Sequence, residues 1–153
     1  MSFSLSTRSR YGVRLMAALA LDWGRGSTLL RDISRREGIS EKYLGQIVIP
    51  LKTAGLASAQ RGSRGGYSLS RAPAEITVLE VVEAIEGPVA PAPCTAPEGS
   101  GGEPPCDRAT ACAASAVWRK LQGDIEAALS SFTLADLAAQ ARQFMPAVSS
   151  YSI

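Results

Sequence analysis

The stretch ISRREGISEKYLGQIVIPLKTAGLASAQRGSRGGYSLS, residues 33 to 70, decides the fold of this chain. A short helix over about Leu29 to Glu37 is expected to end at Gly38, because glycine suits the left-handed position just past a helix end. Ser40 is a good N-cap for the next helix, which runs toward Thr53. Two helices joined by a short turn centred on a glycine are typical of a helix-turn-helix unit.

A proline lies inside the second of these helices. The apolar stripe of this helix is formed by Leu44, Ile47 and Leu51, and Pro50 falls within the same pattern. Because proline has no backbone N–H to donate, we expect the helix to kink there or to break near Ile49.

A β-hairpin is predicted directly after the second helix. One strand covers about residues 57 to 61 and the returning strand about 67 to 70, and the pair Gly65-Gly66 between them permits the positive backbone angles of tight hairpins. The tip carries Arg61 and Arg64. A hairpin tipped with arginine and attached to a helix-turn-helix has the features of the wing in a winged helix.

Three further helices and a loop are predicted in the rest of the chain. Apolar residues repeat at helical intervals over about 6–22, and capping boxes at Thr77 and Thr133 open helices that run to about residues 86 and 142. The stretch from Pro88 to Pro105 holds six of the nine prolines and is expected to be a loop.

A long helix is expected after this loop, from about Asp107 to Ser131, because Val117, Leu121, Ile125 and Leu129 repeat every four residues. The fold class is mainly α with a small β-hairpin wing. The predicted divisions are a winged helix-turn-helix at 1–87, a cysteine loop at 88–106, a long and a short helix at 107–143, and a loosely held tail at 144–153.

Composition and charge narrow the function classes. The 153 residues include no histidine, which removes every Ser-His-Asp and Cys-His triad, so we expect no enzyme. Residues 1–73 carry a net charge of +8 and the remaining 80 residues carry −6. The high net positive charge of the first half favours nucleic acid as a partner. The chain shows no signal peptide and no membrane-length apolar run, and we expect a cytoplasmic protein.

All three cysteines fall in one window, at Cys94, Cys106 and Cys112. Such clustering in a cytosolic protein points to metal or redox chemistry. Zinc is disfavoured because there is no histidine and the cysteine spacing does not match structural zinc sites. Iron–sulfur clusters prefer thiolates. Spacing alone leaves three readings open: an iron–sulfur cluster, a thiol switch, and inert cysteines.

These residues resemble a family of bacterial winged-helix regulators that includes IscR, NsrR, RirA and CymR. The resemblance covers nearly the whole chain. It is carried by Ser9-Arg10-Tyr11-Gly12, Ile33-Ser34, Gly38-Ile39-Ser40, Tyr43-Leu44, Pro50-Leu51-Lys52, Ala54-Gly55-Leu56, Arg61-Gly62, Gly65-Gly66-Tyr67, Glu86-Gly87-Pro88 and the three cysteines before Trp118-Arg119-Lys120-Leu121.

The resemblance implies a homodimer that pairs through the long C-terminal helix and binds a pseudo-palindromic operator in double-stranded DNA. The helix after Ser40 would enter the major groove, and the wing would reach the minor groove or its phosphates. The implied DNA contacts are Arg8, Arg10, Lys42, Tyr43, Gln46, Arg61 and Arg64.

The resemblance also implies an iron–sulfur cluster, 2Fe-2S or 4Fe-4S, on Cys94, Cys106 and Cys112. The chain departs from its cluster-binding relatives in two ways. Eleven residues separate the first two cysteines, and Ser115 stands where IscR-like proteins have a histidine ligand. A fourth ligand would therefore be Ser115, Glu103, Asp107 or an exogenous group. Gly45 stands where several relatives carry glutamate, so operator preference is not transferred.

The sequence thus predicts a dimeric regulator, by default a repressor, whose DNA binding follows a cluster that senses iron or cluster status, nitric oxide or redox stress. The alternative is a CymR-like regulator without a cluster, controlled by a partner protein or by thiol oxidation.

Overall fold

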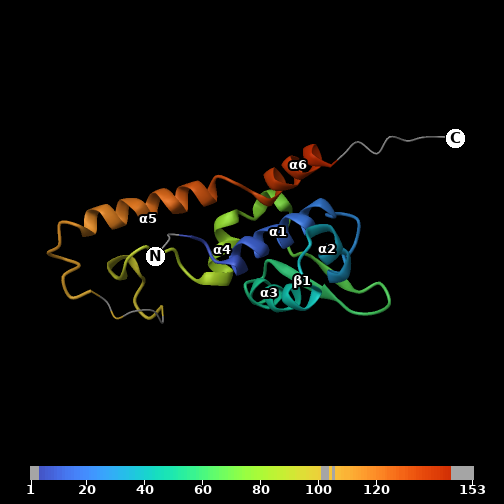
Figure 1. Cartoon of the computed structure of the whole chain (residues 1–153), viewed down its shortest axis with the longest axis horizontal. Helices are drawn as coiled ribbons and strands as arrows, with labels where there is room; N and C mark the ends of the chain where they lie inside the picture. The colour runs from blue at the N-terminus through green and yellow to red at the C-terminus, as the bar shows by residue number, and fades with distance from the viewer. Residues whose placement is uncertain (1–3, 101–103, 105, 146–153) are drawn as a thin grey trace.

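The computed structural model describes residues 4–100, 104 and 106–145. Within this part of the chain, six α-helices and two short 3₁₀ helices accompany one antiparallel pair of strands (Figure 1). In chain order the elements are α1 Thr7–Leu21, α2 Leu30–Glu37, α3 Glu41–Thr53, β1 Ala57–Gln60, β2 Gly66–Leu69, η1 Pro73–Glu75, α4 Val78–Glu86, η2 Pro93–Thr95, α5 Ser115–Ser130 and α6 Leu134–Phe144. The predicted fold class, a winged helix-turn-helix followed by a long helix, is confirmed.

The hydrophobic core lies around α1, which packs against α3, α4 and α6. Leu15 and Met16 of α1 and Leu44 and Leu51 of α3 are fully buried at its centre. Leu134 brings the start of α6 into the same core. The C-terminal helix therefore belongs to the winged-helix body, although α5 separates the two in sequence.

The predicted caps form as expected. The Ser40 hydroxyl accepts a hydrogen bond from the Tyr43 N–H, and Gly38 ends α2 with a φ of +66°. Thr77 and Thr133 both open helices through capping boxes, with Glu80 and Asp136 as their respective partners. Each of these features depends on residues within one helical turn.

Of the kink or break predicted at Pro50, the break near Ile49 does not occur, because α3 continues through Pro50 to Thr53. Proline removes only one intrahelical hydrogen bond, and the Ala54 N–H still donates to the Pro50 carbonyl at 2.9 Å. Buried Ile47 and Leu51 hold the helix on both sides of the proline. Core packing thus outweighs the loss of one hydrogen bond.

The long helix begins at Ser115 rather than near Asp107. The preceding residues form separate turns, in which the Ala109 N–H donates to the Cys106 carbonyl and the Ala111 N–H to the Arg108 carbonyl. The apolar ladder starts only at Val117, so this segment has no packing to offset the cost of helix formation. At the other end of the chain, α6 extends to Phe144, and residues 146–153 of the predicted tail lie outside the described residues.

The hairpin pairs Ala57 with Leu69 and Gln60 with Gly66. Gly66 has a φ of +144°, as the hairpin prediction required, whereas Gly65 has no positive φ. A Cβ atom at Gly65 would instead lie 2.7 Å from the Gln60 carbonyl oxygen, so space explains this glycine.

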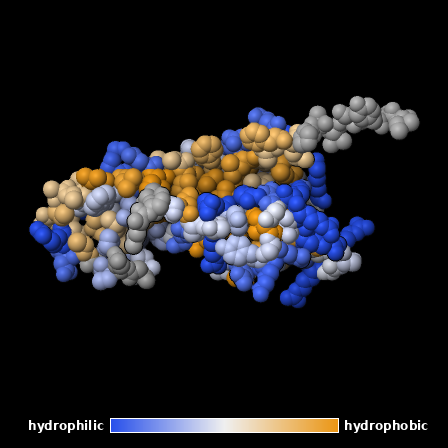
Figure 2. Space-filling model, viewed as in Figure 1, coloured by the Kyte–Doolittle hydropathy of each residue, from blue (hydrophilic) through white to orange (hydrophobic). Residues whose placement is uncertain are grey.

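The helix α5 projects away from the winged-helix body (Figure 1). Ser115 is its only fully buried residue, and Val117 and Trp118 are 58% and 40% exposed. Hydrophobic surface follows this helix, whereas the region around α2, α3 and the hairpin is mainly hydrophilic (Figure 2). None of the helices in the described part of the chain has the length and apolar content that a membrane crossing requires.

Candidate DNA-binding surface and cysteine loop

The outward face of α3 carries two of the predicted DNA contacts. Lys42 and Gln46 are both exposed and lie one turn apart. Tyr43 is half-buried, and its ring meets that of Tyr11 edge-on, with 5.9 Å between the centroids. Tyr43 therefore links α3 to α1, and its role as a DNA contact stays a prediction.

The N-terminal end of α1 places Arg8 and Arg10 in solvent. The Arg10 guanidinium donates to the Thr7 hydroxyl at 2.9 Å. Arg14, one turn further along, pairs with Glu37 at 3.0 Å and lies over the Tyr11 ring. Arg8 and Arg10 are thus exposed and form no ion pair within the described residues, whereas Arg14 joins α1 to α2.

The wing is fixed to the body along its returning strand and near its tip. Backbone hydrogen bonds join Thr28 and Tyr67 in both directions at 2.8 Å, and the Ser27 hydroxyl donates to the Arg64 carbonyl at 2.8 Å. The side chains of Arg61 and Arg64 stay exposed at the tip. The hairpin therefore presents two guanidinium groups from an anchored backbone.

Asp22 ties three segments together beneath the wing. Its carboxylate accepts hydrogen bonds from the Thr28 hydroxyl at 2.8 Å and from Arg36 of α2 at 2.8 and 3.3 Å. This network was not predicted from the sequence, because its members lie apart in the chain and each looks like an ordinary surface residue.

These contacts locate the positive charge of the first half. Three of its four acids form ion pairs, Asp22 with Arg36, Asp32 with Arg35 and Glu37 with Arg14, all on the α1–α2 side. The exposed bases of α3 (Lys42 and Lys52), of the wing (Arg61 and Arg64) and of the start of α1 (Arg8 and Arg10) form no ion pair within the described residues, and these six make up the basic face. Arg25 and Arg31 are likewise exposed and form no ion pair there, and the fourth acid, Glu41, lies in the first turn of α3.

The three cysteines are all free thiols on the loop between α4 and α5, which covers residues 87–114 and is therefore longer than the predicted cysteine loop at 88–106; the name cysteine loop is kept for 87–114. Cys94 lies in η2 and is partly exposed, as is Cys112, and Cys106 is exposed. In the described residues, no group of three or more His, Cys, Asp and Glu side chains is arranged to hold a metal ion. Three thiols are a suitable donor set for an iron–sulfur cluster, but this arrangement does not bring them together.

Two of the proposed fourth ligands, Ser115 and Asp107, lie among the described residues. Ser115 is buried at the first turn of α5, and its N–H donates to the Cys112 carbonyl at 3.1 Å. Asp107 is exposed, and Glu103 lies outside the described residues.

Two side chains of α5 hold the cysteine loop. The Gln122 amide donates to the carbonyls of Val89 and Thr95 at 2.9 and 3.4 Å, and Arg119 donates to the Ala109 carbonyl at 3.3 Å. Both limbs of the loop are thereby attached to one helix.

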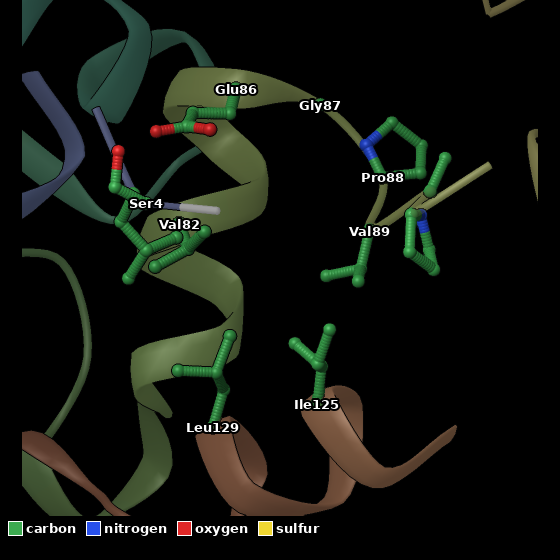
Figure 3. A pocket seen from close by; sticks show the side chains of 11 residues that line it. Ser4, Val82, Glu86, Gly87, Pro88, Val89, Ile125 and Leu129 are labelled. Carbon is green, nitrogen blue, oxygen red and sulfur yellow. The ribbon is translucent and has the colours of Figure 1, made fainter. Parts of the chain in front are cut away.

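A cavity of about 280 Å³ opens where the loop leaves α4 (Figure 3). Val82, Val89, Ile125 and Leu129 give it apolar walls, and the Glu86 carboxylate lies at one side near Ser4 (Figure 3). Glu86 accepts hydrogen bonds from the Ser6 hydroxyl at 2.5 Å and the Ser6 N–H at 3.1 Å. Burial raises the pKa of Glu86, but the hydrogen bonds outweigh it and leave this pKa below its ordinary value. The start of the cysteine loop is thus attached to the N-cap of α1.

Comparison with known proteins agrees with this architecture. A family model described as "Rrf2: Iron-dependent Transcriptional regulator" matches residues 5–140. The chain is 37% identical over 134 residues to the transcriptional regulator CymR of Bacillus subtilis, covering 88% of each chain. It is 38% identical over 133 residues to IscR of Photorhabdus laumondii, covering 87% of this chain and 77% of the relative.

Solved structures give the same result. The structure of B. subtilis CymR, "the Global Cysteine Regulator", matches with a TM-score of 0.72 and 35% identity, over 91% of this chain and 98% of that one. The structure of T. potens IscR matches with a TM-score of 0.72 and 34% identity, over 94% of this chain and 91% of that one. Fold and surface together define a winged-helix DNA-binding protein. The chain belongs to the Rrf2 family of transcriptional regulators.

Proposed function

We propose that this chain is a homodimeric repressor whose operator binding is controlled by an iron–sulfur cluster on Cys94, Cys106 and Cys112. The observation that most supports DNA binding is the basic face, whose exposed lysine and arginine side chains on α3, the wing and the start of α1 form no ion pair within the described residues. Lys42 and Gln46 would reach base edges, and glutamine can pair with adenine in the major groove. Arg8, Arg10, Arg61 and Arg64 would contact phosphates or the minor groove.

The dimer is proposed through α5, because this helix leaves Val117 and Trp118 exposed. An apolar helical face of this kind gains stability when a second copy covers it. A two-fold axis at α5 would present two recognition helices to the two halves of a pseudo-palindromic operator.

The loop between α4 and α5 is the proposed control element. When bound, a cluster would hold three thiolates at one centre and supply reactivity toward oxidants and nitric oxide. The chain's own part is mechanical. Gln122 and Arg119 attach the loop to α5, and Glu86 attaches its start to the N-cap of α1, so rearrangement of the loop would alter how α5 meets the DNA-binding body.

A second candidate, control by thiol oxidation without a cluster, is favoured by a specific observation. All three cysteines are free and at least partly exposed, and they do not form a metal-holding group in the described residues. Among the similar solved structures is Staphylococcus aureus CymR in an "oxidized form", at 32% identity and a TM-score of 0.67. Peroxide would oxidise two thiols to a disulfide and be reduced to water.

Anaerobic purification separates the two candidates. A brown protein that contains iron and sulfide, and loses both on Cys106→Ala substitution, supports the cluster. A colourless protein with no iron contradicts it. If that colourless protein binds DNA and loses binding reversibly after peroxide treatment, the thiol mechanism is supported.

A further inference from the structure

An isoleucine is exposed in the middle of the outward face of α3. Successive residues of a helix are rotated by about 100°, which places Lys42, Gln46, Ile49 and Thr53 in one narrow stripe along the helix. All four are exposed, and Ile49 is 61% exposed. The buried stripe of α3 accounts for Ile47 and Leu51 but not for Ile49, so packing within the chain does not explain this side chain.

Gly45 lies one turn before Ile49 on the same side of the helix. A Cβ atom at Gly45 would meet only Leu30 Cδ1, at 4.0 Å, and its backbone has no positive φ. Neither space nor conformation therefore requires glycine here, and glycine within a helix lowers stability relative to alanine. Its effect is to leave an open space beside Ile49, bordered by a methyl group of Leu30.

We propose that Ile49 and the open space beside Gly45 bind the C5-methyl group of a thymine in the major groove. The inference rests on the proposed function, because it assumes that α3 faces double-stranded DNA. The thymine methyl is the apolar group that base edges offer in that groove. Isoleucine in a helix has one strongly preferred side-chain rotamer, so little conformational freedom is lost when it makes such a contact. Gln46 and Lys42 supply the neighbouring polar contacts, and Ile49 and Gly45 determine specificity for thymine.

The test uses the 153-residue chain and a duplex that the wild-type protein itself selects from a random-sequence library. Each thymine of the selected duplex is replaced in turn by uracil, which lacks only the C5-methyl group. One position in each half-site should show about a fourfold loss of affinity, and replacement in both half-sites about a fifteenfold loss. If no uracil replacement changes affinity, the inference is overturned.

Variants assign the effect to the proposed residues. Ile49→Ala should bind the thymine and uracil duplexes equally, and a retained uracil penalty would contradict the proposal. Gly45→Ala should melt at the same or a higher temperature than the wild type, yet bind the thymine duplex more weakly and lose the uracil penalty. Gln46→Ala, the control on the same stripe, should weaken binding to both duplexes and keep their ratio. If the wild-type protein selects no duplex at all, the proposed DNA binding fails, and this inference with it.

Discussion

The winged helix and the α5–cysteine-loop region are built in contrasting ways. In the winged helix, buried side chains, capping boxes and ion pairs fix each element within a single chain. In α5 only Ser115 is fully buried, and the loop before it is attached mainly through Gln122 and Arg119. The contrast teaches that the DNA-binding surface is preset by the fold of one chain, whereas the second region leaves apolar surface and thiols open to further partners.

Glycine-to-alanine substitutions should show this contrast most strongly. A Cβ atom at Gly66 would lie 2.5 Å from the Thr28 carbonyl oxygen, and Gly66 has a positive φ. Gly66→Ala should therefore separate the wing from Thr28 and lower the free energy of unfolding by about 3 kcal/mol. Chemical denaturation of the purified protein measures this change.

Gly123→Ala is the matched substitution in α5. A Cβ atom there meets nothing within 4 Å, and the position lies on the side of the helix opposite the apolar ladder. We expect stability to be unchanged or to rise by up to about 1 kcal/mol. Equal losses in the two variants would show that the wing is no more tightly constrained than α5.

Arginine substitutions test the contrast in charge. Arg61→Ala should weaken DNA binding by about tenfold and reduce the salt dependence of binding by about one counterion, because a phosphate contact is lost. Arg108→Ala removes an exposed arginine from the cysteine loop and should leave the salt dependence unchanged. Affinity measured across a salt series on one duplex gives both values. Binding that is indifferent to salt would refute the electrostatic account of the basic face.

The sequence predicted the features that depend on near neighbours. The Ser40 cap, the left-handed Gly38 and the capping box at Thr77 each involve residues within one helical turn, and all three are confirmed. The helix-turn-helix and the hairpin were predicted from local signals of this kind. Because such signals are local, they could be read without knowing what packs against each segment.

The features that were missed or wrong depend on distant residues. Arg14 pairs with Glu37, 23 positions away, and Tyr43 is half-buried because Tyr11 of another helix packs against it. Continuation of α3 through Pro50 likewise depends on core packing that periodicity alone does not weigh. The three cysteines are clustered in sequence, but they lie apart along one long loop, and their thiols do not form a metal-holding group within the described residues.

Acid sensitivity should differ between the two capping boxes of the winged-helix body, at the starts of α4 and α6. Glu80 accepts hydrogen bonds from the Thr77 N–H and from Arg71, both at 2.8 Å. Burial raises the pKa of Glu80, but the bonds to Arg71 and Thr77 outweigh it, so the pKa lies below its ordinary value near 4.5. The ionised carboxylate therefore stabilises the fold above pH 4.5, and this contribution is lost as the pH falls through the lowered pKa.

Glu80→Gln should thus lower the unfolding free energy by about 1 kcal/mol at neutral pH and by progressively less in acid. Asp136 has its pKa lowered by hydrogen bonds from Thr133, with no arginine bonded to it, so Asp136→Asn should show the same sign with a shallower pH dependence. Thermal unfolding at several pH values measures both. A Glu80→Gln difference that does not vary with pH would contradict the assigned role of the charge.

The smallest expected effect on stability concerns the attachment of the loop to α5. Gln122→Ala removes hydrogen bonds to the Val89 and Thr95 carbonyls on either side of Cys94, and should lower the unfolding free energy by only about 0.5 kcal/mol. The larger consequence should be kinetic. Cys94 should react with N-ethylmaleimide several-fold faster in the cluster-free protein, because its limb of the loop opens more often.

Cys106 is the internal reference, since it is already exposed and lies on the other limb. Gln140→Ala, which removes an exposed glutamine from α6, should alter neither rate. Mass spectrometry of each cysteine-containing peptide over time gives the separate rates. An unchanged Cys94 rate would mean that Gln122 does not hold the loop closed, and that the loop owes its position to η2 packing on α5. Equal acceleration at Cys94 and Cys106 would mean that the loop opens as one unit rather than limb by limb.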